Sequence, residues 1–213
     1  MTTFTLHWSP RSPYVRKALV ALHEKGLADR VSLLRTHADP LIPHEGLMAI
    51  NPLSKIPTLE REGEAPIFDS RVVMEWADHE GQGPCLFPAK LESRWHVLSL
   101  EAIGNGVMDL ALPWLVETRM RPEAARYQPQ IDAYRRKMNS VADWLETRIE
   151  TIGAEPLHAG HIAIGVALAY LDFRFDAENW RAGRAKLAAW HAGFSERPSM
   201  QATQFRDDPR PTA

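Results

Sequence analysis

The sequence has little cysteine and no long apolar run. Cys85 is its one cysteine, so an intramolecular disulfide and a Cys-x-x-Cys redox or zinc motif are excluded. No segment approaches the roughly 18 consecutive apolar residues that a membrane-spanning helix needs. The first ten residues, MTTFTLHWSP, contain no basic segment followed by an apolar run, so they do not resemble a signal peptide. These absences predict a cytoplasmic protein with no membrane attachment.

An excess of charge is absent as well. The 213 residues include 25 Lys and Arg against 27 Asp and Glu, which gives a formal net charge of -2. The chain therefore has no general electrostatic attraction to nucleic acid or acidic membranes. Its 45% of hydrophobic residues is ordinary for a globular protein, and its length suits one large domain or two small ones.

The first eighty residues begin with a strand pattern followed by a helix pattern. Residues 4–8 switch between apolar and polar side chains with a period of two, which predicts a strand. From Ser12 the period changes to about 3.6 residues. Ser12 is a favourable N-cap, Pro13 a favourable first helical residue and Gly26 a favourable stop, so these residues bound a predicted helix.

Three more strands and a second helix complete this region. A short apolar run at residues 31–34 predicts a strand that is parallel to the first, joined to it by a right-handed crossover. Residues 57–60 and 66–68 predict a hairpin around Gly63, and a helix is expected over residues 69–77. The order β-α-β followed by β-β-α predicts an α/β domain over residues 1–80.

The remainder of the chain is predicted to be helical. Residues 81–88, GQGPCLFP, contain two Gly and two Pro and form the predicted linker. The expected all-helical domain, residues 89–213, has four predicted helices at residues 91–120, 131–149, 161–173 and 187–194. The third is apolar nearly all round, so we expect it at the centre of the domain. Pro198 is expected to end the last helix, and the final residues, DDPRPTA, to be loose.

Four stretches, in order and spacing, resemble glutathione transferases of the cytosolic, bacterial serine type. SPRSPYVRKALVALHEKGL resembles the first strand-to-helix turn of that family, and NPLSKIPTL resembles its loop before an Ile/Val-Pro step. Asp69 and Ser70 resemble its Glu/Asp-Ser pair, and HIAIGVALAYLDFRF resembles its central C-terminal helix. The resemblance covers nearly the whole chain. It implies a thioredoxin-like domain that binds glutathione, an all-helical domain for a hydrophobic electrophile, and a homodimer that needs no metal.

Ser12 lies where this family places the residue that activates the glutathione thiol. A free thiol has a pKa near 8.5, so a transferase must stabilise the thiolate. A helix N-terminus favours an anion, and the Ser12 hydroxyl can donate a hydrogen bond to the sulfur. The alternative is that Ser12 is only an N-cap. Ser9, in the same glutathione-binding turn, is the second candidate, whereas Tyr14 is disfavoured because it falls inside the predicted helix.

Five further residues are expected to bind glutathione. The resemblance implies a cis peptide bond between Ile56 and Pro57, which turns the Ile56 backbone toward the extended cysteinyl unit of glutathione. Asp69 and Ser70 suit the ammonium and carboxylate of its γ-glutamyl end, with a plain capping pair as the alternative. Lys55 suits the glycyl carboxylate, with a solvated loop lysine as the alternative.

The second substrate is expected between the two domains. Candidate walls of its site are Trp8, Tyr14, Met108, Trp114 and Trp180. Most aromatic and Met side chains belong to a hydrophobic core, which is the alternative for each of them. Asn105 lies where bacterial relatives carry a polar residue that faces the cleft.

One segment departs from the family pattern. The family begins its central helix with a Ser/Thr-x-x-Asp capping box, whereas this chain has His158-Ala159-Gly160-His161. We expect the cap to be lost at a cost of about 1 kcal/mol, so that His158→Thr with His161→Asp would raise thermal stability. The alternatives are a pH-sensitive histidine substitute for the box and adventitious metal binding.

The sequence therefore predicts a detoxifying glutathione transferase that joins the glutathione thiolate to a hydrophobic electrophile. One alternative on the same fold is a glutathione-dependent disulfide reductase or peroxidase without a protein cysteine. Redox members that use a cysteine near Ser12 are disfavoured, because Cys85 lies in the predicted linker. Another alternative is a non-catalytic carrier of glutathione or hydrophobic ligands.

Overall fold

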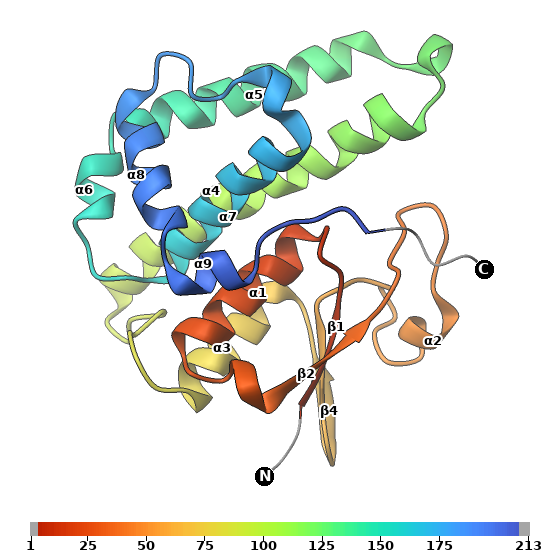
Figure 1. Cartoon of the computed structure of the whole chain (residues 1–213), viewed down its shortest axis with the longest axis vertical. Coiled ribbons are helices and arrows are strands. Elements are labelled where there is room, and N and C mark those ends of the chain that lie inside the picture. The colour runs from red at the N-terminus through yellow and green to blue at the C-terminus, as the bar shows by residue number, and fades with distance from the viewer. Residues whose placement is uncertain (1–3, 209–213) are drawn as a thin grey trace. The chain divides into compact units, whose positions relative to one another are not determined.

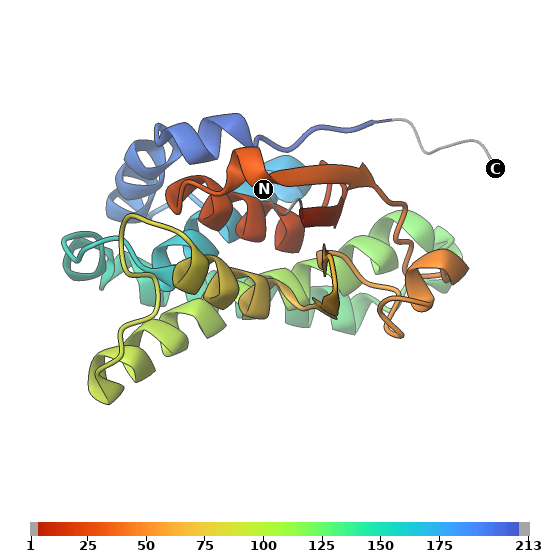
Figure 2. The same ribbon diagram turned by 90° about the horizontal axis from the view of Figure 1, so that it is seen from below.

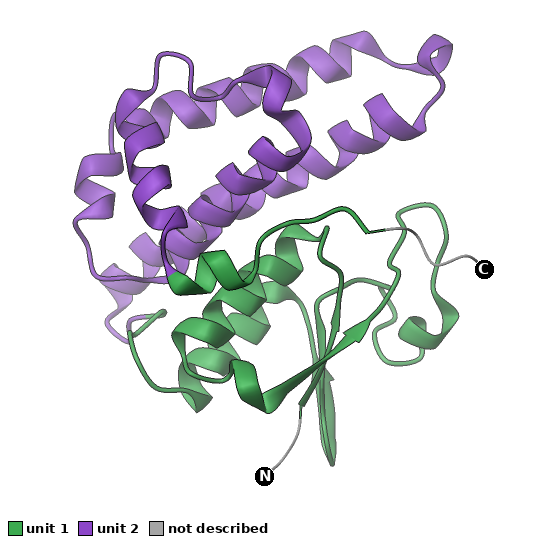
Figure 3. Ribbon diagram, in the orientation of Figure 1, with its two compact units in different colours: residues 1–87, 198–213 green, residues 88–197 purple. Residues whose placement is uncertain are grey.

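The computed structural model describes residues 4–208, which form two compact units (Figure 3). Unit 1 consists of two segments, one that ends at Phe87 and one that begins at Pro198, and unit 2 consists of residues 88–197. The expected helical domain over residues 89–213 therefore extends further than unit 2. The difference arises because the segment from Pro198 onward packs with the N-terminal residues.

Unit 1 is built on a mixed four-stranded sheet (Figure 1). Its strands are β1 (Phe4–Trp8), β2 (Val31–Arg35), β3 (Thr58–Arg61) and β4 (Glu64–Ile67). They lie in the order β2-β1-β3-β4, with β1 and β2 parallel and the other two pairs antiparallel. The predicted β-α-β and β-β-α order is confirmed, and the fold is the thioredoxin-like one that the resemblance implies.

The helices of unit 1 follow the predicted boundaries closely. The α-helices in its described residues are α1 (Pro13–Glu24), α2 (Glu45–Met48), α3 (Ser70–Glu80) and α9 (Pro198–Ala202), with a 3-10 turn η1 (Ala28–Arg30). Ser12 caps α1 and Pro13 is its first residue. Gly26, just beyond its end, has a φ of 67°, a conformation that glycine adopts without steric cost.

α1 and α3 lie side by side on one face of the sheet and enclose the core of unit 1 (Figure 1). The buried side chains of this core are Phe4, Leu6, Val15, Ala18, Leu22, Leu27, Val31, Leu59, Val73 and Ala77. Burial of apolar surface contributes about 25 cal/mol per Å². It is this burial that fixes the two helices against the strands.

The segment that begins at Pro198 packs against α1. The helix before it does end ahead of Pro198, as predicted, but Pro198 is also the first residue of a further helix, α9. Proline is favourable there because the first N–H of a helix has no partner within the helix. Arg16 of α1 donates to the carbonyl oxygen of Met200 at 3.1 Å, and its guanidinium lies 4.4 Å from the centre of the Phe205 ring.

Unit 2 is helical, as predicted. Its elements are α4 (Leu91–Leu115), a π-helical turn η2 (Val116–Met120), 3-10 turn η3 (Glu123–Ala125), α5 (Gln128–Glu146), α6 (Ile149–Gly153), α7 (Ala159–Phe175), 3-10 turn η4 (Asp176–Glu178) and α8 (Ala185–Ser195). α7 is buried along nearly its whole length, which confirms its predicted place at the centre. None of the helices within residues 4–208 is both long enough and apolar enough to cross a bilayer.

α4 and α7 run alongside each other (Figure 1 and Figure 2), and Gly104 of α4 lies directly against Ala163 of α7. A Cβ atom added to Gly104 would lie 2.6 Å from both the Cβ and the carbonyl oxygen of Ala163, far inside ordinary carbon contact. A Cβ added to Gly106, two residues further along α4, would meet no atom within 4 Å. A Cβ added to Gly160 of α7 would lie 2.5 Å from the Cβ of Leu100 of α4, so the lack of side chains at both Gly104 and Gly160 allows the close spacing of this helix pair.

Two histidines cap the N-terminus of α7, so the expectation that the cap is lost is wrong. Nδ1 of His158 accepts hydrogen bonds from the backbone N–H groups of Gly160 and His161 at 3.1 and 3.4 Å. Nδ1 of His161 accepts from the backbone N–H of His158 at 3.2 Å, which completes a capping box. The two rings stack with their centroids 3.8 Å apart.

Both rings must be neutral to accept these hydrogen bonds. Burial lowers the pKa of His161 to about 4 and holds the pKa of His158 below its ordinary value. Each ring then carries its proton on Nε2. Nε2 of His161 donates to the carbonyl oxygen of Ile152 at 2.7 Å, and Nε2 of His158 donates to Glu155 at 2.9 Å. All four ring nitrogens have partners, which explains how histidine replaces the usual Ser/Thr and Asp.

Gly104→Ala and Gly106→Ala should change stability in opposite directions. The methyl group of Gly104→Ala clashes with α7 and should lower the free energy of unfolding by about 1–3 kcal/mol. The methyl group of Gly106→Ala fills open space and removes a flexible residue from a helix, so it should raise that free energy by about 0.5–1 kcal/mol. Urea unfolding followed by circular dichroism measures both, and equal effects would contradict the close approach at Gly104.

His158→Ala removes the N-cap acceptor of α7 and should lower the free energy of unfolding by about 1 kcal/mol. His158→Thr retains a side-chain acceptor at the same position and should lose clearly less. Because a box already exists, restoring Thr and Asp at positions 158 and 161 is no longer expected to raise stability. Thermal unfolding at pH 7 compares the two single variants, and equal melting temperatures would show that capping at position 158 contributes nothing.

Candidate functional site

The end of the sheet at which β1 finishes carries the first part of the candidate site. His7 lies opposite Thr58 in the antiparallel pair formed by β1 and β3. β1 therefore ends where β3 begins, which brings the residues that follow Trp8 and those that precede Thr58 to the same end of the sheet. α1 begins directly after this turn, and its N-terminus therefore opens at the same end of the sheet.

β4 brings a third segment to this end. Leu59 lies opposite Ile67 in the antiparallel pair formed by β3 and β4, whose register shifts between Leu59 and Arg61, so β4 ends where β3 begins. α3 begins shortly afterwards, at Ser70. The N-termini of α1 and α3 thus open at one end of the sheet, where their first backbone N–H groups and helix dipoles favour an anionic ligand.

Two serines hold the turn that precedes α1. The backbone N–H of Ser12 donates to the carbonyl oxygen of Ser9 at 3.2 Å. Oγ of Ser9 accepts from the backbone N–H of Arg11 at 3.3 Å, and Oγ of Ser12 accepts from that of Val15 at 3.3 Å. Because a hydroxyl that accepts still has its own hydrogen to donate, Ser12 can cap the helix and donate to a ligand at the same time.

Exposure distinguishes these two serines. Ser9 is buried, with 8% of its surface exposed, whereas Ser12 is partly exposed. A ligand that arrives from solvent can reach the hydroxyl of Ser12 more readily. The geometry therefore favours Ser12 over Ser9 as the activating residue, and that role stays a prediction.

The loop before β3 presents its backbone at the same end of the sheet. The Ile56–Pro57 peptide bond is cis, as the resemblance implies, and so is the Phe68–Asp69 bond. Among residues 4–208, no hydrogen bond is formed by the backbone N–H or carbonyl of Ile56. Both groups are therefore available to an extended ligand that pairs like an added strand. Lys55, the preceding residue, is exposed.

Asn51 holds this loop in place, a role that was not among those predicted from the residue pattern. The residue is fully buried. Its amide nitrogen donates to the carbonyl oxygen of Lys55 at 3.1 Å and to Oγ1 of Thr58 at 3.0 Å, and its amide oxygen accepts from the backbone N–H of Leu53 at 3.0 Å. The signal for this role is Asn directly before Pro in NPLSKIPTL, since Asn side chains stabilise turns by bonding the backbone two residues on.

Asp69 caps the N-terminus of α3. Its Oδ1 accepts from the backbone N–H of Arg71 at 2.9 Å, so the capping role that the sequence offered as an alternative is confirmed. Asp69 is exposed, whereas Ser70, the first helical residue, is buried. The second carboxylate oxygen of Asp69 remains for a cationic group, so the cap and a ligand contact are compatible.

Two arginines hold the C-terminal segment of unit 1 beside the candidate site. Arg11, in the turn before α1, pairs with Asp207 at 3.1 Å. Arg35, at the end of β2, donates to both carboxylate oxygens of Asp208 at 2.8 and 3.2 Å, and these bonds hold the pKa of Asp208 below its ordinary value. The expectation that DDPRPTA is loose is therefore wrong for Asp207 and Asp208, and its other residues lie outside the described ones.

Trp8 and Tyr14 lie on either side of the turn in unit 1. Trp8, the last residue of β1, is partly buried against the core, and the Arg206 guanidinium lies 6.0 Å from the centre of its ring. Tyr14 is the second residue of α1 and is partly exposed. The part of these two rings in binding a second substrate stays a prediction.

The remaining candidates lie in unit 2. Met108 is fully buried, and Trp114 and Trp180 are 2% and 6% exposed. The Trp114 ring centre lies 4.6 Å from that of Phe175, and both tryptophans line one small hollow inside the unit. The Asn105 amide is hydrogen-bonded within α4. The two tryptophans are thus packed as core residues, and the substrate roles of these residues stay predictions.

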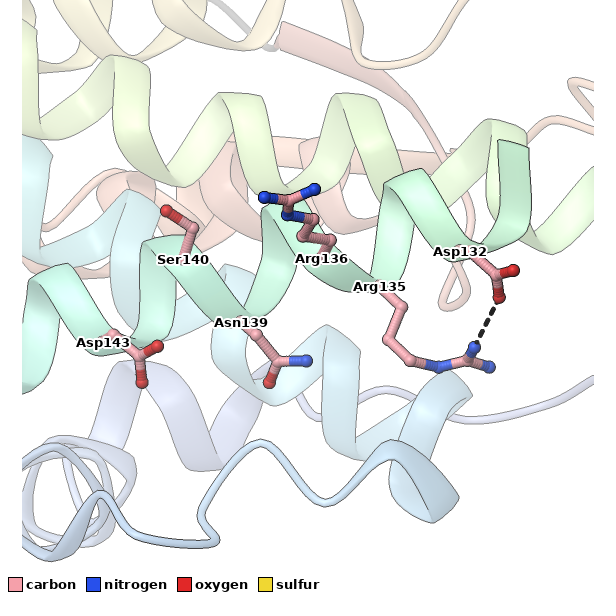
Figure 4. Close-up of a pocket in the computed structure, with 6 residues that line it drawn as sticks. All are labelled: Asp132, Arg135, Arg136, Asn139, Ser140 and Asp143. Carbon is pink, nitrogen blue, oxygen red and sulfur yellow. Dashed lines mark hydrogen bonds and ion pairs between the residues drawn. The ribbon is translucent and has the colours of Figure 1, made fainter. Parts of the chain in front are cut away.

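A shallow hollow on α5 contains none of these candidates. It is lined by polar side chains of one helix: Asp132, Arg135, Arg136, Asn139, Ser140 and Asp143 (Figure 4). Arg135 pairs with Asp132 and Glu178, and Arg184 pairs with Asp143. Asp132, Arg135 and Asp143 of its lining are thus engaged in ion pairs, and none of the residues expected to bind glutathione or the second substrate lines this hollow.

The chain is similar to proteins of one family. Residues 11–80 match the family described as "Glutathione S-transferase, N-terminal domain". The chain is 30% identical over 196 residues to the uncharacterized GST-like protein YibF of Escherichia coli (strain K12), which covers 91% of this chain and 94% of YibF.

Two solved structures are similar along nearly the whole chain. A glutathione transferase family member from Pseudomonas fluorescens Pf-5 with bound glutathione has a TM-score of 0.92 and 35% identity, over 96% of this chain and 100% of that one. A glutathione S-transferase from Methylobacillus flagellatus KT with bound glutathione has a TM-score of 0.85 and 30% identity, over 95% and 99%.

Asn51→Ala should lower the free energy of unfolding by about 1–3 kcal/mol, because it leaves buried backbone and side-chain groups of the loop without partners. Leu53→Ala is the matched control, since Leu53 is exposed in the same loop and its truncation should change stability by no more than about 0.5 kcal/mol. Urea unfolding measures both variants. If they unfolded at the same urea concentration, Asn51 would not be the residue that holds the loop.

Proposed function

Because the chain belongs to the glutathione transferase family, we propose that it is a glutathione transferase that binds glutathione at the end of the sheet in unit 1. The observation that carries the proposal is the convergence there of two helix N-termini with the backbone of Ile56. Glutathione has two carboxylates, one ammonium and an extended peptide backbone. Each of these groups has a complementary partner at this end of the sheet.

The contacts follow from the chemistry of each group. The cysteinyl unit pairs with the backbone N–H and carbonyl of Ile56 in the manner of an added strand. The γ-glutamyl carboxylate binds at the N-terminus of α3 beside Ser70, and its ammonium binds the free carboxylate oxygen of Asp69. The glycyl carboxylate binds Lys55. That two similar proteins were crystallised with bound glutathione supports this arrangement.

Ser12 is the proposed activating residue. In this arrangement the sulfur lies at the N-terminus of α1, where the Ser12 hydroxyl donates to it while its oxygen still accepts from Val15. Lowering the thiol pKa by about two units requires about 2.7 kcal/mol of preference for the thiolate. A charge-assisted hydrogen bond and a helix dipole together are of that size.

The reaction is attack of this thiolate on a hydrophobic electrophile bound by unit 2. A carbon–sulfur bond forms, and either a leaving group departs with its electron pair or the neighbouring carbon takes up a proton. The thiol proton goes to solvent before the attack. No metal and no protein thiol takes part, and the enzyme is proposed to act in detoxification as a cytoplasmic homodimer.

The experiment is a pH titration of the ultraviolet thiolate absorbance of bound glutathione in wild type and Ser12→Ala. Wild type should show a thiol pKa about two units below that of free glutathione, and Ser12→Ala should lose most of that shift. Ser9→Ala is the control and should retain it. Binding of glutathione itself, measured by calorimetry, should persist in both variants because Ile56 and the N-terminus of α3 are unchanged.

Each other outcome would contradict a defined part of the proposal. An unshifted thiol in wild type with intact binding would favour a carrier over an enzyme. A shift that Ser9→Ala loses and Ser12→Ala keeps would transfer the activating role to Ser9. Absence of glutathione binding would overturn the proposed site altogether.

A further inference from the structure

Three side chains from two separate parts of unit 2 converge at the start of α7. His96 comes from the second turn of α4, and Glu155 and His158 come from the segment that joins α6 to α7. One oxygen of Glu155 lies 3.0 Å from Nε2 of His96, and the other lies 2.9 Å from Nε2 of His158. The three ligand atoms lie within 4.8 Å of one another.

We infer that His96, Glu155 and His158 form a binding site for a transition-metal dication of the zinc type. Two imidazole nitrogens and one carboxylate oxygen are ligands that Zn²⁺, Co²⁺, Ni²⁺ and Cu²⁺ favour, whereas Mg²⁺ and Ca²⁺ prefer oxygen alone. The site is independent of the proposed glutathione chemistry. A bound ion would tie α4 to the residues that lead into α7.

Small movements bring the ligands into coordination. Zinc bonds of about 2.0–2.1 Å in a tetrahedron set neighbouring ligand atoms about 3.3 Å apart. Oε2 of Glu155 already lies 3.1 Å from Nε2 of His96 and 2.9 Å from Nε2 of His158. The His96 side chain is 49% exposed and the Glu155 side chain 29% exposed, so His96 has room to turn and the ion can enter from solvent. The fourth position of the tetrahedron is left to water.

His158 offers the ion its Nε2, the edge of the ring opposite the one that caps α7. Its Nδ1 accepts from the backbone N–H groups of Gly160 and His161, and its Nε2 faces Glu155. A neutral imidazole carries a proton on one of its two nitrogens, so Nε2 can bind the ion once that proton has moved to Nδ1. Metal binding therefore replaces the two cap hydrogen bonds at Nδ1, at a cost to the N-cap of α7.

His161 is not part of this site, although the sequence offered it beside His158 as a candidate metal ligand. Both of its nitrogens are engaged, Nδ1 by the backbone N–H of His158 and Nε2 by the carbonyl oxygen of Ile152. The second imidazole comes instead from His96, 62 positions earlier in the sequence than His158. That pairing depends on the packing of α4 beside α7.

The test is Zn²⁺ binding to the untagged full chain after removal of metals with EDTA, measured by calorimetry and by the melting temperature. Wild type should bind one ion and melt roughly 5–10 °C higher at a zinc concentration 100-fold above the dissociation constant. Mg²⁺ should have no such effect. Co²⁺ should give the visible absorption of a four-coordinate ion.

Three variants identify the ligands. His96→Ala and Glu155→Gln should weaken zinc binding at least tenfold. Loss of a residue that only hydrogen-bonds a metal ligand already costs about tenfold or more in affinity, and loss of a ligand itself should cost no less. His158→Thr should weaken it equally while it keeps the helix cap, so the folded state is retained. His79→Ala is the control, since the side chain of His79 is 86% exposed and lies in unit 1.

The inference is overturned if wild type binds no zinc at a defined stoichiometry, or if His96→Ala binds it as tightly as wild type. It is also overturned if His79→Ala weakens zinc binding as much as His96→Ala, or if Mg²⁺ raises the melting temperature as Zn²⁺ does.

Discussion

The antiparallel pairings of β3 with β1 and β4 are the constraint on which the candidate site depends. Because both pairs are antiparallel, β1 and β4 end where β3 begins. The segments that carry Ser9, Ile56 and Asp69 therefore come to one end of the sheet. A shift of one residue in the pair of β1 and β3 would turn every side chain of the shifted strand to the opposite face.

The first backbone N–H groups of a helix have no partner within the helix, and in this chain they serve one purpose in unit 1 and another in unit 2. In unit 1, Ser12 and Asp69 each satisfy one backbone N–H and leave the others to favour an anion, so these helix ends suit a ligand. In unit 2, His158 and His161 close the end of α7 with a complete box. The helix is buried, and a free N–H there would have no water to bond. Exposure therefore decides whether a helix end serves binding or folding.

Three features of the structure each depend on an individual residue. Asn51 ties both ends of the loop that carries Ile56, and Arg35 holds Asp208 beside the first turn. Gly104 allows α4 to approach α7. Asn51 and Arg35 act on the backbone of unit 1 near the candidate site, whereas Gly104 acts on the packing of α4 with α7 in unit 2.

The sequence alone determined the local elements and the family. The capping by Ser12, the hairpin around Gly63 and the apolar α7 follow from residue types and spacing, because propensity and periodicity act within a few turns of chain. The pairing of Arg35 with Asp208 and the meeting of His96 with Glu155 were decided by tertiary structure. These contacts join residues far apart in the sequence, and burial and hydrogen bonding between such residues leave no periodic signal along the chain. The histidine cap is local in sequence, but the neutral rings that it needs depend on burial in the tertiary structure.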